Sequence, residues 1–201
     1  ILSTILLNVH DKQLTMTSTD MELEMTATLP VAVEQEGKTT VSARKFLDIC
    51  RALPADATIS FKAQDNKALV KAGKSRFSLS TLPSEDFPDS EGASYTDEIS
   101  LPQSALKSLL DETSFAMASQ DVRYYLNGLL LEREEATLRA VATDGHRLAM
   151  GSLTTSNKVT EKNSLIVPRK AILELGRLLS DSDENVTIAF SSQQIKVELP
   201  D

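Results

Sequence analysis

This 201-residue sequence contains little histidine or cysteine, two residue types that commonly serve acid–base chemistry and zinc binding. Its two histidines are His10 and His146, and Cys50 is its one cysteine. Asp144 lies two positions before His146, a spacing compatible with proton transfer or with a shared metal ion. No third ligand follows at a suitable spacing, and the sequence has no glycine-rich phosphate loop, HExxH motif or cysteine pair. We therefore expect no enzymatic activity, no catalytic residue, no metal site and no cofactor.

The overall composition predicts a soluble globular protein. Hydrophobic residues make up 41% of the sequence and charged residues 25%, and no apolar run reaches the ~18 residues of a membrane span. Cys50 lies among Phe46, Ile49 and Leu53, so we expect a buried thiol. A single cysteine cannot form an internal disulfide, which fits a reducing compartment. We therefore expect a cytoplasmic protein with no membrane partner.

The ends and the net charge of the chain add two expectations. The chain starts with Ile1-Leu2-Ser3, without an initiator Met or a basic flank, so we expect a piece cut from a longer protein. The formal net charge is −8, which taken alone argues against wrapping nucleic acid by charge neutralisation. A role on DNA would therefore require cations gathered on one local surface.

The elements that must position these side chains occur twice along the chain. Residues 14–20 and 138–144 are alternating strands that both end in Thr-Asp, and each follows another apolar strand, 5–9 or 126–131. Both copies then continue in one order: a helix entry, a short helix and two more strands. The paired ranges are 41–45 and 166–170, 46–53 and 171–179, 57–61 and 186–190, and 68–72 and 195–199.

A third helix entry at residues 99–103 opens a helix at 104–117, with Leu106, Leu109 and Leu110 forming an apolar stripe. Residues 82–92 contain two prolines, a glycine and several acids, and we interpret them as a linker. The sequence therefore predicts an α+β fold of two domains, each dominated by antiparallel strands with few helices on one face. The predicted domains are residues 1–92 and 93–201.

The predicted helices show neutral to positive faces outward. Arg44, Asp48 and Arg51 share one face of the first helix, Lys170, Glu174 and Arg177 share the equivalent face, and the third helix shows Gln103 and Lys107. One interpretation is an ordinary solvated face whose ion pairs contribute about 0.3–0.5 kcal/mol each. The other is a surface that faces a polyanion, with weak phosphate contacts that permit sliding.

Residues 120–128 and 142–149 are the most distinctive stretches. We expect Tyr124 and Tyr125 on opposite faces of a strand, and Thr143-Asp144-Gly145 as a turn followed by His146 and Arg147. On chemistry alone this is a hairpin turn in which Asp144 caps backbone amides and His146 is exposed.

The stretches QDVRYYLNG and ATDGHRLA resemble the middle domain of the bacterial DNA polymerase III β sliding clamps, and SARKFLDICRALP and SRFSLSTLPSEDFP resemble the first domain. The resemblance covers essentially the whole chain. It implies the DNA-clamp fold, with duplicated domains of antiparallel sheet and pore-facing helices, in a head-to-tail homodimeric ring around double-stranded DNA. It also implies that the start of the first domain, the end of the second and the whole third domain are missing.

The resemblance further implies three sets of functional residues. A groove that accepts a short Gln- and Leu/Phe-containing peptide from DNA polymerase, the clamp loader and repair enzymes matches Leu126, Thr143, Gly145, His146, Arg147 and Leu148. The residues facing DNA match Arg44, Arg51, Gln120, Arg123, Tyr124, Tyr125, Arg169, Lys170 and Arg177. The strand edge that closes the ring on a second subunit matches Lys45, Lys74, Arg76, Phe77 and Leu79.

Without the resemblance, a repeat-built scaffold that binds proteins but no DNA would remain an open alternative. The acidic net charge favours the scaffold, whereas the basic helix faces oppose it. The family motifs decide for a DNA sliding clamp, and the scaffold stays the alternative.

Overall fold

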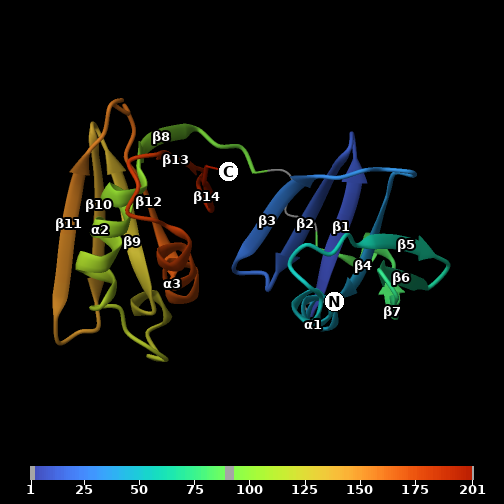
Figure 1. The fold of residues 1–201 in the computed structure, drawn as a ribbon. Helices are drawn as coiled ribbons and strands as arrows, with labels where there is room; N and C mark the ends of the chain where they lie inside the picture. The colour runs from blue at the N-terminus through green and yellow to red at the C-terminus, as the bar shows by residue number, and fades with distance from the viewer. Residues whose placement is uncertain (1–2, 89–92, 201) are drawn as a thin grey trace. The chain divides into compact units, whose positions relative to one another are not determined.

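The computed structural model describes residues 3–88 and 93–200. The chain divides into two compact units, residues 1–89 (unit one) and 90–201 (unit two), drawn in Figure 1. Both units consist of antiparallel strands with a few short helices, so the predicted α+β class is confirmed. Among the described residues, no helix has the length and apolar character to cross a membrane.

Unit one contains a seven-stranded sheet in the order β3-β2-β1-β4-β7-β6-β5. Ser42 starts its one described α-helix, because the Ser42 Oγ accepts a hydrogen bond from the Lys45 backbone N–H. The elements are β1 (Thr4–His10), β2 (Gln13–Thr19), β3 (Glu24–Pro30), β4 (Gly37–Ser42), α1 (Ala43–Ala52), β5 (Ser60–Gln64), β6 (Lys67–Ala72), β7 (Ser75–Leu82) and the 3₁₀ turn η1 (Ser84–Asp86).

Unit two contains two sheets, a four-stranded one in the order β11-β10-β9-β12 and a three-stranded one in the order β14-β13-β8. Its elements are β8 (Asp97–Pro102), α2 (Gln103–Ser114), the 3₁₀ turn η2 (Tyr124–Leu126), β9 (Gly128–Glu134), β10 (Thr137–Thr143), β11 (Leu148–Thr154), β12 (Asn163–Pro168), α3 (Arg169–Leu178), β13 (Asn185–Phe190) and β14 (Ile195–Glu198).

The two units repeat one topology. The order β3-β2-β1-β4 in unit one equals β11-β10-β9-β12 in unit two, and a ten-residue helix follows the fourth strand in both. The predicted repeat lacked one strand per copy, β3 and β11. All seven residues of β3 are exposed, so this edge strand has no buried-and-exposed alternation for a sequence pattern to reveal.

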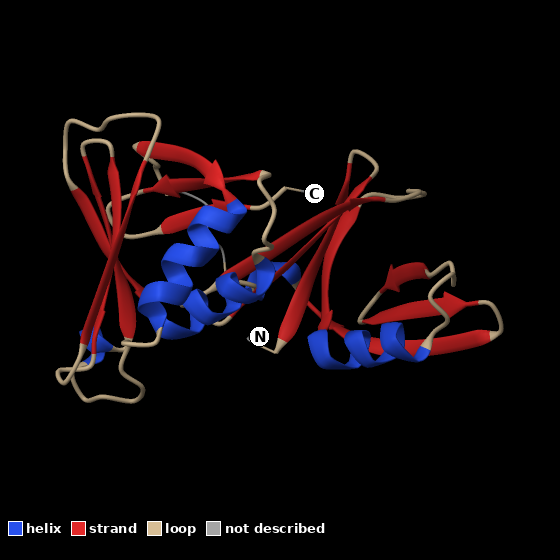
Figure 2. Cartoon of the chain, turned by 60° about the vertical axis from the view of Figure 1, so that its left-hand side comes forward, coloured by secondary structure: helices blue, strands red, loops and turns tan. Residues whose placement is uncertain are grey.

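The core of unit two is the larger one. Helices α2 and α3 contact each other and lie on one face of the four-stranded sheet, as Figure 2 shows. Leu106, Leu109 and Leu110 of α2 are buried, as their spacing predicts. The cluster in unit one is smaller and consists of Leu7, Val41, Ala68, Val70 and Leu79. No described element of unit one covers its sheet as α2 covers that of unit two.

Several local expectations were wrong. The segment at Tyr124 and Tyr125, expected to be a strand, is the turn η2. The side-chain amide of Asn127 bonds the backbone N–H and carbonyl of Asp121 and so closes a loop before β9. The two rings then meet edge to face, with centroids 5.9 Å apart, instead of pointing to opposite faces.

Three further corrections concern α2, β5 and Cys50. Gln103 is buried, because its side-chain oxygen accepts hydrogen bonds from the backbone N–H and the hydroxyl of Ser180. Strand β5 begins at Ser60 instead of Ala57, whose N–H is used in a turn with Pro54. The Cys50 thiol is half-buried, and desolvation raises its pKa.

Candidate functional site

The turn between β10 and β11 is held by two side chains. The Thr143 Oγ1 accepts from the Gly145 N–H (3.1 Å) and donates to the Arg147 carbonyl (2.7 Å). The Asp144 Oδ1 accepts from the N–H groups of His146 (2.9 Å) and Arg147 (3.0 Å). These two backbone bonds, followed by the Arg147 side chain, lower the Asp144 pKa. Thr143 and Asp144 therefore build the turn, and their polar atoms are largely used within it.

Glycine is required at position 145 for two reasons. Its φ of +89° is a backbone conformation that side chains with a Cβ disfavour. In addition, a Cβ added there would lie 3.1 Å from Nη2 and 3.2 Å from Nη1 of Arg123. Gly145 thus lets the Arg123 guanidinium lie directly against the turn.

Arg123 brings the loop at residues 120–127 to this turn. Its Nη2 donates to the Asp144 carbonyl at 3.5 Å, and its fork pairs with the carboxylate of Asp121. Tyr124 and Tyr125 in the same loop are exposed, whereas Leu126 is buried and supports the loop from below. The structure therefore joins Arg123 and the turn residues into one local surface, whereas Leu126, which was expected to line the peptide groove, is buried.

The apolar part of this surface lies on β11 and beside it. Leu148 is 64% exposed, and Met150, which points to the same face two residues on, is 65% exposed. Arg147 lies over the Phe115 ring at 5.6 Å, and this ring is also exposed. Met150 and Phe115 were missed from the sequence. Strand alternation from Leu148 would have indicated Met150, but no local pattern places Phe115 under Arg147.

Five of the six cations expected to face DNA lie on α1 and α3, which carry three basic residues each against one acid, and the sixth, Arg123, lies against the β10–β11 turn. Arg44 is paired with Asp48 and Arg177 with Glu174 on exposed helix surface. Arg169 is half-buried, and its Nη1 donates to the Met117 carbonyl at 3.1 Å. Helix α2 differs from the expected neutral or positive face, because it carries Lys107 against Asp111 and Glu112.

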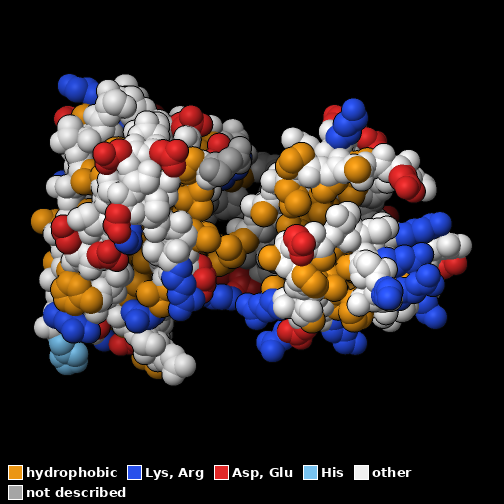
Figure 3. Space-filling view, in the orientation of Figure 1, with side chains coloured by type: hydrophobic (Ala, Val, Ile, Leu, Met, Phe, Trp, Pro, Cys, Tyr) orange, Lys and Arg blue, Asp and Glu red, His pale blue; other side chains and the backbone are white. Residues whose placement is uncertain are grey.

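The predicted ring-closing edge is strand β7. It pairs with β6 along residues 75–80 but with β4 only at Thr81 and Leu82, so its second edge is open among the described residues. Leu79 is buried, Phe77 is half-buried, and Lys45, Lys74 and Arg76 are exposed. Figure 3 shows Lys and Arg side chains gathered over β5–β7, where the sequence also places Lys62, Lys67 and Lys71.

Two family models cover most of this chain. The model of the DNA polymerase III beta subunit N-terminal domain matches residues 1–91, and that of the central domain matches residues 100–201. The chain belongs to the DNA polymerase III β subunit family. The beta sliding clamp of Pseudomonas aeruginosa is 50% identical over 197 residues, covering 98% of this chain and 54% of the relative. The beta sliding clamp of Escherichia coli K12 is 46% identical over 202 residues, covering 100% and 55%.

Solved clamp structures have the same fold. The crystal structure of the DNA polymerase III subunit beta from Pseudomonas aeruginosa matches with a TM-score of 0.94 at 49% identity, covering 99% of this chain and 55% of that one. A DNA polymerase sliding clamp from Caulobacter crescentus matches with a TM-score of 0.89 at 36% identity, covering 98% and 55%. The chain therefore spans about half the length of the β subunits it matches.

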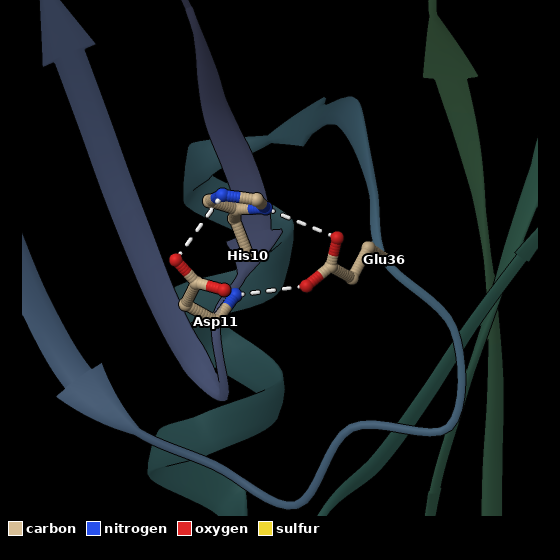
Figure 4. A group of neighbouring side chains, drawn as sticks. All are labelled: His10, Asp11 and Glu36. Carbon is tan, nitrogen blue, oxygen red and sulfur yellow. Dashed lines mark hydrogen bonds and ion pairs between the residues drawn. The ribbon is translucent and has the colours of Figure 1, made fainter.

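A second polar cluster in this β subunit chain lies at the β1–β2 hairpin (Figure 4). The His10 ring pairs with Glu36 through Nδ1 at 3.0 Å and with Asp11 through Nε2 at 3.3 Å. The Glu36 hydrogen bond is the main cause that raises the His10 pKa. These three side chains could each offer a metal ligand. All three side chains are exposed, and their contacts are those of an exposed ion-pair cluster.

Proposed function

We propose that this chain is part of a non-enzymatic DNA sliding clamp that encircles duplex DNA and tethers replication and repair proteins to it. The supporting observation is that its two units match the first two domain models of the β subunit family in order. The identity of 36–50% and the TM-scores of 0.89–0.94 extend over nearly all of the chain. We assign residues 1–92 to the first clamp domain and 93–201 to the second, in a cytoplasmic protein.

The DNA contact in this proposal is weak and local. Helices α1 and α3 occupy equivalent places in the repeat and carry the DNA-facing candidates Arg44, Arg51, Arg169, Lys170 and Arg177. The chain as a whole has a net charge of −8. A few cations on an acidic protein give few phosphate contacts, and such contacts are non-specific and weakened by salt. A ring of this kind holds DNA by enclosing it and lets the duplex slide.

The partner contact lies at the β10–β11 turn. Exposed Leu148 and Met150 offer apolar surface, while Arg147 and Arg123 offer cations and His146 a polar ring beside it. This combination suits a short peptide with apolar anchors and an acidic neighbour. We propose that DNA polymerase and the clamp loader bind there through a Gln- and Leu/Phe-containing segment. Ring closure would use the open edge of β7, which pairs with a second copy of the protein.

The alternative is a scaffold that binds proteins without DNA. The net charge and the pairing of Arg44 and Arg177 with acids favour it, because paired cations attract phosphate less strongly. The two hypotheses differ in whether the protein is topologically linked to DNA.

The test uses the full-length protein, loaded by its clamp loader onto a nicked circular plasmid and isolated by gel filtration. We expect the protein to stay on circular DNA and to leave after the plasmid is cut once. The control is a second enzyme digest that leaves the circle intact. Equal loss from circular and linear DNA, or equal retention on both, would contradict the clamp and favour the scaffold or a direct DNA binder.

A further inference from the structure

Asp121 is fixed in place by the amide of Asn127. The Asn127 Nδ2 donates to the Asp121 carbonyl at 2.8 Å, and the Asn127 Oδ1 accepts from the Asp121 N–H at 2.9 Å. Both backbone polar groups of Asp121 are thus held by one side chain, which leaves little freedom for its own carboxylate.

The Asp121 carboxylate holds Arg123 in turn. Its Oδ1 accepts from the Arg123 backbone N–H at 2.8 Å and from Nε at 3.0 Å, and its Oδ2 accepts from Nη2 at 2.9 Å. Parallel bonds from Nε and Nη2 to the two oxygens fix the plane of the guanidinium. The Asp121 side chain is 22% exposed, and that of Arg123 is 49% exposed. The pair is therefore sheltered on one side and open to a ligand on the other.

The third link runs from Arg123 to the turn. The guanidinium lies against Gly145, and Nη2 also reaches the Asp144 carbonyl at 3.5 Å. Nη1 donates to no acceptor in the described part of the chain. The side chain is 49% exposed. An arginine whose Nε and Nη2 are engaged by protein, and whose Nη1 has no acceptor among the described residues, presents an oriented donor for an oxygen of a ligand.

We propose that Asp121 is a positioning residue that holds Arg123 across the Gly145 turn, so that Nη1 binds a carboxylate of the partner peptide. The inference rests on the proposed function and specifies the ligand chemistry of that site. Asp121 and Asp144 are bonded to Arg123 and Arg147 within the site, and the residues that follow Gly145 directly, His146 and Arg147, add no further acid. The oxygens of Asp121 and Asp144 therefore repel an incoming carboxylate less than free acids would.

The experiment measures fluorescence anisotropy of the full-length protein with two fluorescein-labelled nine-residue peptides. Both contain one Gln, two Leu and one Phe, and they differ only in an Asp or an Asn beside the Gln. We expect wild type to bind the Asp peptide about tenfold more tightly, the ratio that a charge-assisted hydrogen bond of about 1.4 kcal/mol gives. Asp121→Asn, which keeps the side-chain shape, should reduce that ratio below about threefold.

The matched control is Asp181→Asn, which breaks the 2.8 Å ion pair with Lys107 elsewhere in unit two and should leave the ratio unchanged. Arg123→Ala should bring the ratio of the two affinities to about one. Adding Asp121→Asn to Arg123→Ala should not change the ratio further, because both residues act through one contact. Additive losses, or an undiminished ratio in Asp121→Asn, would overturn the inference.

A second readout reports the orientation of Arg123 without any peptide. In wild type, the Nε–H of Arg123 should give a slowly exchanging NMR signal because Asp121 accepts from it. That signal should be lost in Asp121→Asn, while the other amide signals show an unchanged fold. Asp121→Glu should recover it in part. If wild type binds neither peptide, the proposed partner site itself is contradicted. If it binds both and the Nε–H signal survives in Asp121→Asn, only the positioning role fails.

Discussion

Asp20 and Asp144 occupy the same position in two copies of one turn. The Asp20 Oδ1 accepts from the N–H groups two and three residues on, at 3.1 and 2.9 Å, and the Asp144 Oδ1 does so at 2.9 and 3.0 Å. Thr19 and Thr143 each accept from the N–H two residues later. The Thr-Asp turn is therefore a property of the repeated fold. The chemistry specific to unit two lies in the residues that follow, beginning with Gly145.

Met21 stands where unit two has Gly145. Its φ is +77° and it is 71% exposed, so its Cβ strains the backbone and its side chain has little packing to lose. We expect Met21→Gly to stabilise unit one by about 0.5–1 kcal/mol, since glycine adopts this conformation without a Cβ clash. Denaturant unfolding would measure the change. Met21→Ala keeps the Cβ and serves as the control, and an equal gain in that variant would contradict the strain explanation.

Gly128 and Gly176 should respond in opposite ways to a methyl group. A Cβ at Gly128 would lie 2.6 Å from the Val167 carbonyl oxygen, whereas nothing lies within 4 Å of one at Gly176. We expect Gly128→Ala to destabilise unit two by about 2–3 kcal/mol. Gly176→Ala should stabilise helix α3 by up to about 1 kcal/mol, as helix propensity predicts. Urea unfolding of both variants checks this, and two changes of the same sign would contradict it.

The buried pair of Arg133 and Asp97 should be sensitive to the loss of one partner. Arg133 is fully buried, Asp97 is 10% exposed, and Nε and Oδ2 are 3.2 Å apart. Arg133 also donates to the carbonyls of Glu135, Thr137 and Asn157. Arg133→Leu would leave a buried carboxylate and these three carbonyls without this donor, and we expect a loss of about 3–5 kcal/mol. Lys196→Gln removes an exposed pair with Glu198 and should change stability by less than about 0.5 kcal/mol.

Acid should release Arg123 only at low pH. Its side-chain hydrogen bond is the largest cause that lowers the Asp121 pKa to about 2. Because the folded pKa is depressed, the stabilisation is complete above the ordinary pKa of about 3.9 and is lost as the pH falls towards 2. The carboxyl carbon shift of Asp121 should titrate with a midpoint of about 2, and Arg123→Ala should raise that midpoint. A midpoint near 3.9 in wild type would count against the pairing.

Arg51 provides a test of the DNA contact. It is exposed on α1 and, among the described residues, has no ion-pair partner. If it contacts a phosphate in the loaded ring, Arg51→Ala should lower the slope of log affinity against log salt by about 0.9. Lys12→Ala, in the β1–β2 hairpin away from α1, should leave the slope unchanged. Equal effects of both substitutions would indicate general electrostatics instead of a helix contact.

Much of the repeated frame could be predicted because its pattern is local. Paired Thr-Asp ends, alternating strands and the apolar stripe of α2 are properties of short segments, and the structure has them in the predicted order. Strand β3 was missed because it is exposed along its whole length, so its place depends on hydrogen bonds to β2 and not on burial.

The candidate site was harder to predict from the sequence, because its shape also depends on hydrogen bonds between separate residues and not on a local burial pattern. Tyr124 and Tyr125 have strong strand propensity, but the Asn127 amide closes a loop that overrides it. The position of Arg123 over Gly145 depends on two segments about twenty residues apart, and no spacing rule indicates it. The role of Asp121 could therefore be identified only from its hydrogen bonds in the structure.

The unequal sizes of the two cores determine which part of the chain should unfold first. Among the described residues, the main buried cluster of unit one has five members and that of unit two has nineteen. Buried apolar area is the main source of stability, so unit one should open first and more often. A protease that cleaves only opened chain would then remove unit one and leave a resistant piece close to residues 93–200. For a cell, this makes the first half of the chain the part that quality-control proteases reach first.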